Sequence, residues 1–330
     1  MRRSRTVARK EIRMKTFRNL FTNPWFVLAI LLYIGSLFVL SRRSEFSISE
    51  ALIELVIFGL AFPLLAWLAT IRARPLTIRV DPSGAEMLAL LAYVVALSVY
   101  LAFGLQTIDS WLPQDWIASD RIKFFVTLGK KLLVFVALPL VIFGLAWGYS
   151  VRDFGFQRAG LRKLGRSHLP IVLVASCAVL AFNYFLGGAA APLREGKFST
   201  LQLLVGIPLC FIWLTIEAGL VEEFFFRAFL QTRLSAWFRS EMTGVVLMSM
   251  IFGLAHAPGF IFRHAGEVEG LGANPTALDA VAYSITTLAI SGVFFGVIWA
   301  RTKNLFALVL IHAAGDLFPN LSDFVKTWGL

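Results

Sequence analysis

The amino-acid sequence predicts an all-α protein, a polytopic transmembrane helical bundle with about eight or nine spans. Of its 330 residues, 58% are hydrophobic and only 15% are charged, and the mean hydropathy is +0.75. Apolar runs of roughly 17 to 25 residues recur along the chain, and a helix of that length crosses the hydrocarbon core of a bilayer. Trp25 and Trp328 lie near the ends of such runs, as interfacial anchors do. These features exclude an ordinary soluble domain.

The apolar runs also give the order of the spans. No Ser/Gly-rich linker and no repeat of fixed period separates a second domain, so the spans form one helical unit. The predicted spans cover about residues 25–41, 51–71, 85–105, 124–149, 169–188, 203–231, 243–262, 278–300 and 304–320.

Lysine and arginine are distributed unequally between alternate loops. If the N-terminus is cytoplasmic, the inner segments carry 20 of these residues and the outer segments 10, and Arg227 inside a span completes the 31. Because cytoplasmic loops of membrane proteins are enriched in cations, the N-terminus is expected to be cytoplasmic. Lys130 and Lys131 do not fit the pattern, and snorkelling towards the membrane surface accounts for them. The net charge of +11 therefore reflects topology, and no nucleic-acid partner is expected.

Three late spans contain ionisable residues. The span at 203–231 carries Glu217, Glu222, Glu223 and Arg227, the span at 243–262 carries His256, and the span at 304–320 carries His312 and Asp316. A charged side chain at the centre of a membrane helix costs about 2.5 to 3.5 kcal/mol on insertion scales, and such residues usually serve a function inside the bundle.

Helical spacing groups these residues further. Glu223 and Arg227 are four residues apart, so they can pair on one face of their helix, whereas Glu222 is rotated by about 100° and needs a partner from another helix. His312 and Asp316 are also four apart. At about 1.5 Å per residue from the nearest inner cations, Glu222, His256 and His312 all fall in the inner half or middle of the membrane.

A glutamate, two histidines and an aspartate that meet inside a bilayer form either a water-activating site or a metal site. A carboxylate can take a proton from water, and an imidazole can orient that water or donate to an oxyanion. In the metal alternative, zinc is the expected ion, with Glu222, His256 and His312 as candidate ligands. The sequence contains neither the H-E-x-x-H motif of soluble zinc proteases nor a G-x-S-x-G nucleophile motif.

The same residues resemble the motifs of a known family. "EEFFFR" at 222–227, "FGLAH" at 252–256 and "HAAGD" at 312–316 occur in order on three apolar helices. They are similar to the three conserved boxes of the CPBP intramembrane proteases, which include type II CAAX prenyl endopeptidases and bacteriocin-processing relatives. The resemblance covers about residues 203–320. Together with the basic N-terminus and the apolar runs, it gives three expected segments: a basic cytoplasmic segment at 1–24, N-terminal transmembrane helices at 25–168 and a CPBP-like catalytic core at 169–330.

The resemblance also implies roles for individual residues. Glu222, with His256, would activate the hydrolytic water, and His312 with the third-box residue would stabilise the oxyanion. Glu223 and Arg227 would shape the site and hold the peptide, and Phe252, which opens the second box, is a further supporting residue. Asp316 departs from the family pattern, because better characterised prenyl-protein proteases carry asparagine there. An ionised aspartate cannot donate to an oxyanion, so Asp316 would be protonated, orient His312 or ligate a metal.

The expected function is therefore an integral membrane endopeptidase of the CAAX type, in a bacterial plasma membrane, whose partners are membrane lipids and a peptide or protein substrate with or without an attached lipid. Two alternatives use the same polar residues: a non-catalytic membrane scaffold or immunity-type protein that binds a peptide, and a proton-coupled transporter. A purely structural ion-pair network formed by Glu222, Glu223 and Arg227 is a further alternative to a catalytic site. The remaining histidines, His168 and His264, lie in loops, and their side chains are expected to be solvated.

Overall fold

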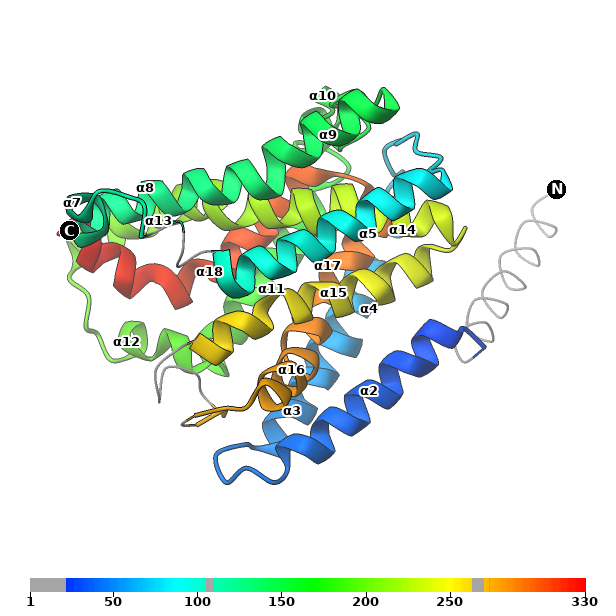
Figure 1. The fold of residues 1–330 in the computed structure, drawn as a ribbon. Helices are drawn as coiled ribbons and strands as arrows, with labels where there is room; N and C mark the ends of the chain where they lie inside the picture. Colours follow the sequence, from blue (N-terminus) through cyan, green and yellow to red (C-terminus); the bar gives the residue numbers. More distant parts are fainter. Residues whose placement is uncertain (1–21, 105–107, 109, 263–269, 273) are drawn as a thin grey trace.

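A computed structural model describes residues 22–330 except 105–107, 109, 263–269 and 273, and within that part the secondary structure is entirely helical (Figure 1). In chain order the elements are α2 (Pro24–Leu40), α3 (Ile48–Glu54), η1 (Leu55–Ala61), α4 (Phe62–Ala69), α5 (Gly84–Val99), η2 (Tyr100–Gly104), α7 (Gln114–Ala118), α8 (Asp120–Lys131), η3 (Leu132–Ala137), α9 (Leu138–Trp147), α10 (Arg158–Leu164), α11 (Leu169–Phe185), η4 (Gly188–Ala190), α12 (Ala191–Arg194), η5 (Gln202–Gly206), α13 (Ile207–Leu214), η6 (Thr215–Leu220), η7 (Glu223–Gln231), α14 (Thr232–Trp237), α15 (Glu241–Phe262), α16 (Ala277–Thr286), α17 (Leu288–Thr302) and α18 (Leu305–Trp328).

The helices reproduce the predicted polytopic bundle. Among the described residues, seven helices are long and apolar enough to cross a membrane, and an eighth span results if the bent pair α10 and α11 is counted as one. The helix α2 is also apolar but has only 17 residues. Each of the nine predicted runs coincides with one of these helical stretches, so the prediction of an all-α membrane bundle is confirmed.

Several spans contain π-helical stretches, in which i→i+5 hydrogen bonds widen the turn. Three of them, η1, η3 and η5, are followed within two residues by Pro63, Pro139 and Pro208, respectively. Proline has no N–H to donate and clashes with the preceding turn, so a widened turn there has a local cause. By contrast, no proline follows η6 or η7 within two residues. These two stretches flank Glu222 in the helix that runs from Gln202 to Trp237. Such π-helical turns occur frequently at functional sites.

Contacts between loops agree with the predicted alternation of spans. Contacts that join predicted inner segments run from Lys163 Nζ to the Arg74 carbonyl (2.7 Å) and from Lys303 Nζ to Glu241 Oε1 (2.7 Å). At the same end, Arg233 Nε is 2.8 Å from Glu86 Oε1, at the start of the predicted span 85–105. Contacts that join predicted outer segments run from Arg43 Nη1 to Asp279 Oδ2 (2.8 Å), from Arg121 Nη2 to the Trp328 carbonyl (3.1 Å) and from Gln202 Nε2 to the Leu330 carbonyl (2.9 Å).

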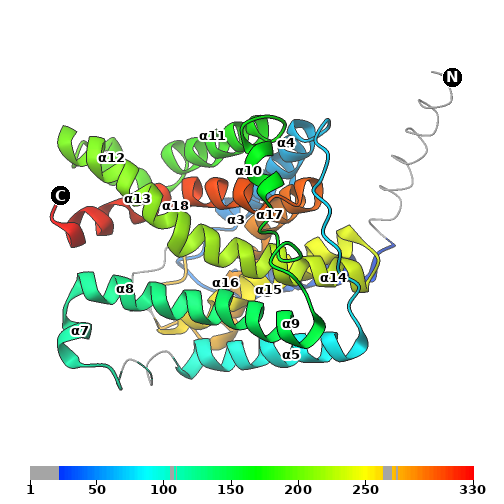
Figure 2. The ribbon, with the colours of Figure 1, turned by 90° about the horizontal axis from the view of Figure 1, so that it is seen from above.

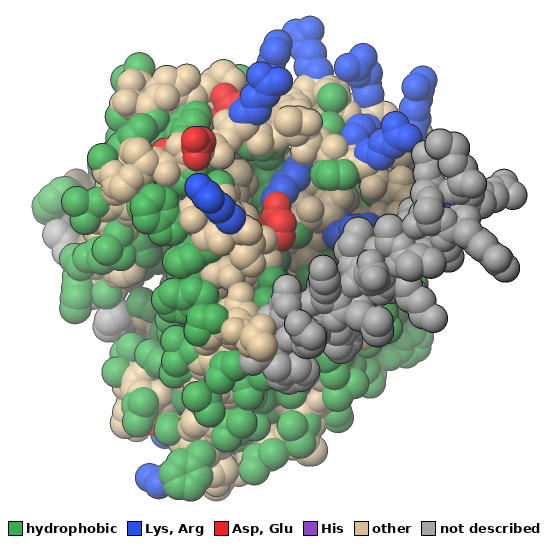
Figure 3. All heavy atoms as spheres, turned by 90° about the vertical axis from the view of Figure 1, so that its right-hand side faces the viewer, with side chains coloured by type: hydrophobic (Ala, Val, Ile, Leu, Met, Phe, Trp, Pro, Cys, Tyr) green, Lys and Arg blue, Asp and Glu red, His purple; other side chains and the backbone are tan. Residues whose placement is uncertain are grey.

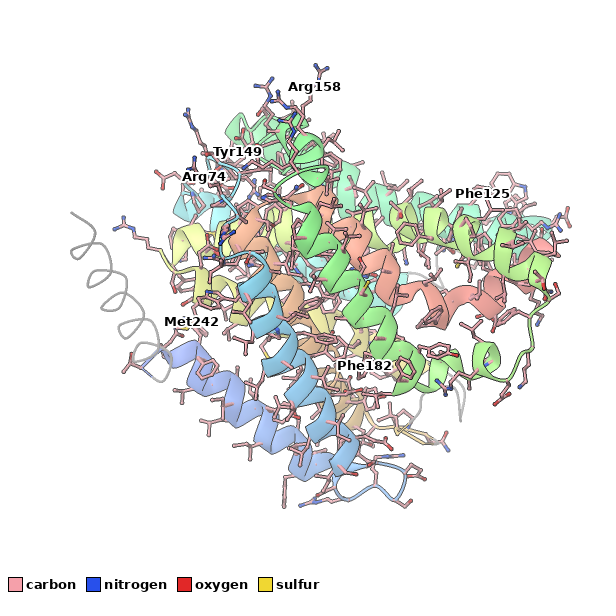
Figure 4. The ribbon with its side chains drawn as sticks, turned by 180° about the vertical axis from the view of Figure 1, so that it is seen from behind. Arg74, Phe125, Tyr149, Arg158, Phe182 and Met242 are labelled. Atoms are coloured by element: carbon pink, nitrogen blue, oxygen red, sulfur yellow. The ribbon has the colours of Figure 1, made fainter. Side chains whose placement is uncertain are left out.

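The basic side chains of the predicted inner loops lie towards one end of the bundle. Arg74 and Arg158 are exposed there, close to Tyr149, whereas Phe125 of α8 lies at a distance from them (Figure 4). The space-filling view of that side of the molecule shows Lys and Arg side chains gathered along its upper edge (Figure 3).

The prediction that the His168 side chain is solvated is wrong. Its side chain is buried and not solvated, because α10 and α11 meet at an angle of 71° and fold the connecting turn inward. There Asn304 Nδ2 donates to His168 Nδ1 at 2.9 Å and to the Gly160 carbonyl at 3.1 Å. His264, the other histidine predicted to be solvated, lies outside the described residues.

Phenylalanine fills the core around the polar residues of the site. Phe224, Phe225, Phe226 and Phe229 are fully buried or nearly so, and they pack against rings from other segments, such as Phe143 of α9. Figure 2 shows α8 and α9 running beside α13 and α5, so these helices cover one side of the helix Gln202–Trp237, which is called the site helix below.

Candidate active site

His312 of α18 lies at the centre of a cluster of carboxylates. Its Nδ1 is 2.7 Å from Glu223 Oε1, and its Nε2 is 3.3 Å from Asp316 Oδ2 and 3.7 Å from Glu222 Oε2. The ring also packs against Phe295 of α17, with 5.2 Å between the ring centroids. The structure therefore brings together four of the predicted site residues, and Glu222 faces a residue on another helix as its spacing required.

Glu223 and Arg227 form the predicted pair within one helix. Arg227 Nε is 3.4 Å from Glu223 Oε2, and both side chains are fully buried. The guanidinium also donates from Nη1 to Met248 Sδ at 2.7 Å and lies 4.7 Å from the ring centroid of Phe252. A buried charge needs a partner of opposite sign, and an arginine over an aromatic face gains further attraction. Phe252 thus supports Arg227 directly.

The cluster is uncovered on one side. The Glu223 and Arg227 side chains are fully buried, whereas Glu222 is 18% exposed and Asp316 37% exposed. The two partly exposed carboxylates can meet water or a substrate, and the buried pair lies behind them.

His256 of α15 stands apart from this cluster. Its Nδ1 is 2.8 Å from the Phe252 carbonyl, and the two rings are in contact. Since a carbonyl can only accept, Nδ1 carries a proton, which leaves Nε2 available to accept one. Among the described residues, His256 makes no hydrogen bond or ion pair with Glu222, Glu223, His312 or Asp316. It is linked to them through Phe252.

Gly219 allows α18 to approach the site helix. A Cβ on this residue would lie only 2.6 Å from the backbone oxygen of Val309, and real Cβ atoms essentially never come so close. Gly219 precedes Glu222 by three residues, and Val309 precedes His312 by three. The close contact therefore holds together the two turns that carry the facing side chains.

The arrangement of side chains does not fit the zinc site that the sequence offered as an alternative. Among the described residues, no group of three or more His, Cys, Asp or Glu side chains is placed to hold a metal ion. The three candidate ligands, Glu222, His256 and His312, are divided between the cluster and the separate position of His256.

One ion pair beside the site was not recognised in the sequence. Lys131, at the end of α8, pairs with Glu217 of η6, and their side chains are 32% and 16% exposed. Lys131 also interacts electrostatically with Glu222 and Asp316. The sequence does contain a signal for this pair, because a lysine within one apolar run and a glutamate within another suggest partners inside the membrane.

Residues 204–318 match the protein-family model described as type II CAAX prenyl endopeptidase Rce1-like. The matched segment contains Glu222, Glu223, Arg227, His256, His312 and Asp316. It excludes Lys131. Comparison with curated proteins and with solved structures finds no match.

Proposed function

We propose that this chain, of which residues 204–318 match the type II CAAX prenyl endopeptidase Rce1-like family model, is a CPBP-family endopeptidase that hydrolyses a peptide bond with a water molecule activated by Glu222. The observation that carries the proposal is the arrangement around His312, where one imidazole faces Glu223 on one side and Glu222 and Asp316 on the other. Glu222 as the base and His312 as the hydrogen-bond donor are therefore neighbours, and both lie beside the partly exposed Asp316.

Glu222 acts as the general base. Its carboxylate is partly exposed and has no cation on its own helix face, so it can accept a proton from a water molecule. The water oxygen forms a bond to the carbonyl carbon of the peptide, and the tetrahedral intermediate carries the negative charge on the former carbonyl oxygen. Collapse of the intermediate breaks the C–N bond, and the proton held by Glu222 passes to the departing amine. His256 orients the water through Nε2, since its Nδ1 is engaged by the Phe252 carbonyl.

His312 stabilises the oxyanion. With Nδ1 directed at Glu223, the ring is fixed in orientation, and a proton on Nε2 can be donated to the developing charge. Asp316 lies beside Nε2 at 3.3 Å, so before substrate binds its carboxylate can accept from that nitrogen and hold the ring in orientation, and the developing oxyanion then replaces it as the acceptor. This role requires no asparagine at position 316.

Glu223 and Arg227 are positioning residues. The Glu223 carboxylate orients His312, and Arg227 compensates the charge of Glu223 within the buried part of the bundle. Phe252 holds the guanidinium from one side and fixes His256 through its carbonyl from the other.

In this proposal the N-terminus and the loop around residue 160 lie on the cytoplasmic side of a bacterial plasma membrane. The site belongs to a catalytic core that spans residues 169–330. The support is the cation asymmetry of the sequence together with the pairing of loops at each end. Cysteine labelling from one side of the membrane tests it: a cysteine at position 160 that reacts with an impermeant reagent outside intact cells would overturn the orientation.

The activity is tested in liposomes containing the purified protein and a reporter peptide that ends in a lipidated cysteine followed by three residues. The same peptide without the lipid is the second substrate. Mass spectrometry identifies the bond that is cut. Cleavage of either peptide by wild type, with loss of cleavage in Glu222→Gln, supports the endopeptidase, and the ratio of the two rates shows whether the lipid is recognised. Binding of both peptides without any cleavage would support the scaffold, and a chelator that abolishes cleavage until zinc is restored would support the metal alternative.

A further inference from the structure

A cavity of about 370 Å³ lies between α8, the site helix and α18, towards the predicted outer end of the bundle. Asp120 and Lys326 line it where α8 begins and α18 ends, and Glu217 lines it from the middle of the site helix. The cavity therefore extends from the ends of two helices into the bundle.

One hydrogen bond and the spacing along two helices place this cavity next to the catalytic cluster. Asn320, which lines the cavity, donates from Nδ2 to the backbone carbonyl of Asp316 at 2.8 Å. On the opposite wall, Glu217 pairs with Lys131 and precedes Glu222 by five residues in the same helix. Both helices thus pass from the cavity to the site within about one turn.

The lining suits a peptide better than a lipid chain. Aromatic walls from Phe124, Trp213 and Phe324 can cover apolar side chains. Between them, Thr127 and Asn320 offer hydrogen-bond donors and acceptors of the kind that a peptide backbone requires. A hydrocarbon chain would leave these polar groups without partners, at a cost in free energy. The volume falls within the range of about 300 to 1,000 Å³ that is typical of ligand pockets.

We propose that this cavity is the subsite for the peptide segment on one side of the scissile bond, with the Lys131–Glu217 pair at the end nearest the bond. The proposal rests on the endopeptidase function above. It adds a binding region that is formed partly by α8, outside the segment matched by the family model. Lys131 and Glu217 then act as specificity-determining residues, because one or the other meets the first charged or polar group of the segment.

The subsite is tested by blocking the cavity after the protein has folded, so that failure to fold cannot explain the result. In a Cys177→Ala, Cys210→Ala background, Thr127→Cys is reacted with N-ethylmaleimide in liposomes. The matched control is Gly129→Cys on the same helix, where a Cβ would meet no atom within 4 Å. The unlipidated and lipidated reporter peptides are the probes.

Modification at position 127 is expected to raise KM at least tenfold while kcat changes less than threefold, and modification at position 129 is expected to change KM less than twofold. Equal effects at the two positions, or an effect at position 127 on kcat alone, would overturn the proposal. Peptide binding is also measured in the Glu222→Gln protein, where a tenfold weaker Kd after modification at 127 is expected. This second measurement needs no turnover, so absence of cleavage by wild type would contradict the proposed function while Kd still decides whether the cavity binds the peptide.

Discussion

Gly219 of the site helix lies against the backbone carbonyl of Val309 in α18, with no room for a side chain between them. Because each residue precedes a site residue by three positions, this contact fixes the distance between Glu222 and His312. The catalytic arrangement therefore depends on a residue that has no functional group.

Replacing Gly219 by alanine is expected to separate the two helices. The added Cβ would approach the Val309 oxygen to 2.6 Å, and overpacking of this kind costs typically about 1 to 3 kcal/mol. We expect a loss of at least tenfold in kcat/KM together with a lower unfolding temperature. The control is Gly35→Ala in α2, where a Cβ meets nothing within 4 Å. Activity of Gly219→Ala equal to that of this control would show that the close approach is not needed.

Removing the buried cation of the site is expected to destabilise the protein. In Arg227→Ala the fully buried Glu223 carboxylate loses its arginine and keeps only its contact with His312, and breaking a buried pair costs about 3 to 5 kcal/mol. The yield of folded protein should fall and activity should be lost. Replacing both residues by glutamine removes both charges, so folded yield should recover while cleavage does not. The measurement is size-exclusion chromatography of the detergent-solubilised variants, followed by the peptide assay; normal folding of Arg227→Ala would contradict a structural role for the pair.

A second buried pair provides a contrast, because its arginine lies six residues further along the same helix, away from His312. Arg233 Nε is 2.8 Å from Glu86 Oε1, both side chains are fully buried, and the guanidinium lies 4.5 Å from the ring centroid of Phe229. Arg233→Gln leaves Glu86 without its cation, so the unfolding temperature should fall as it does for Arg227→Ala. The remaining folded molecules should keep a kcat within about threefold of wild type, since Arg233 touches none of the proposed catalytic groups. A much larger loss of kcat per folded molecule would show that this pair also serves the chemistry.

The sequence predicted the fold class because membrane spans are long and apolar, a property that is read directly from composition. It also predicted the pairing of Glu223 with Arg227, since four-residue spacing within one helix fixes their proximity. It did not predict that Lys131 pairs with Glu217, because contacts between helices distant in the chain depend on packing that spacing does not encode. The separate position of His256 has the same origin: similar depth in a membrane does not determine which faces of two helices meet.

His168 shows the same limit outside the membrane spans. A polar loop suggested a solvated histidine, but the bend between α10 and α11 buries the ring beside Asn304. Burial lowers the pKa of His168 below its usual value, and the nearby charge of Lys163 lowers it further. The folded protein therefore holds this residue neutral at a pH where the unfolded chain already binds a proton.

The stability of the protein should consequently depend on pH through His168. Since the unfolded state binds the proton first, the free energy of unfolding should decrease as the pH falls below about 6.5, the ordinary pKa of histidine. Thermal unfolding of wild type and His168→Gln at pH 8 and pH 5.5 measures the effect. The decrease in unfolding temperature between the two pH values should be smaller for His168→Gln, which has no group to titrate there. An identical decrease in both proteins would exclude a contribution from His168.

The central claim is that Glu222 is the general base, and the most direct measurement compares kcat of wild type with that of Glu222→Gln on the reporter peptide in liposomes. The glutamine keeps the shape of the side chain but cannot accept a proton, and general-base catalysis is typically worth about 10² to 10⁴-fold in rate. The matched control is Glu195→Gln, which alters an exposed carboxylate paired with Lys197 away from the site. We predict that Glu222→Gln folds, binds the peptide with a Kd within about threefold of wild type and loses at least 10²-fold in kcat, while Glu195→Gln retains full activity. A folded Glu222→Gln protein that cleaves the peptide at the wild-type rate would contradict the account.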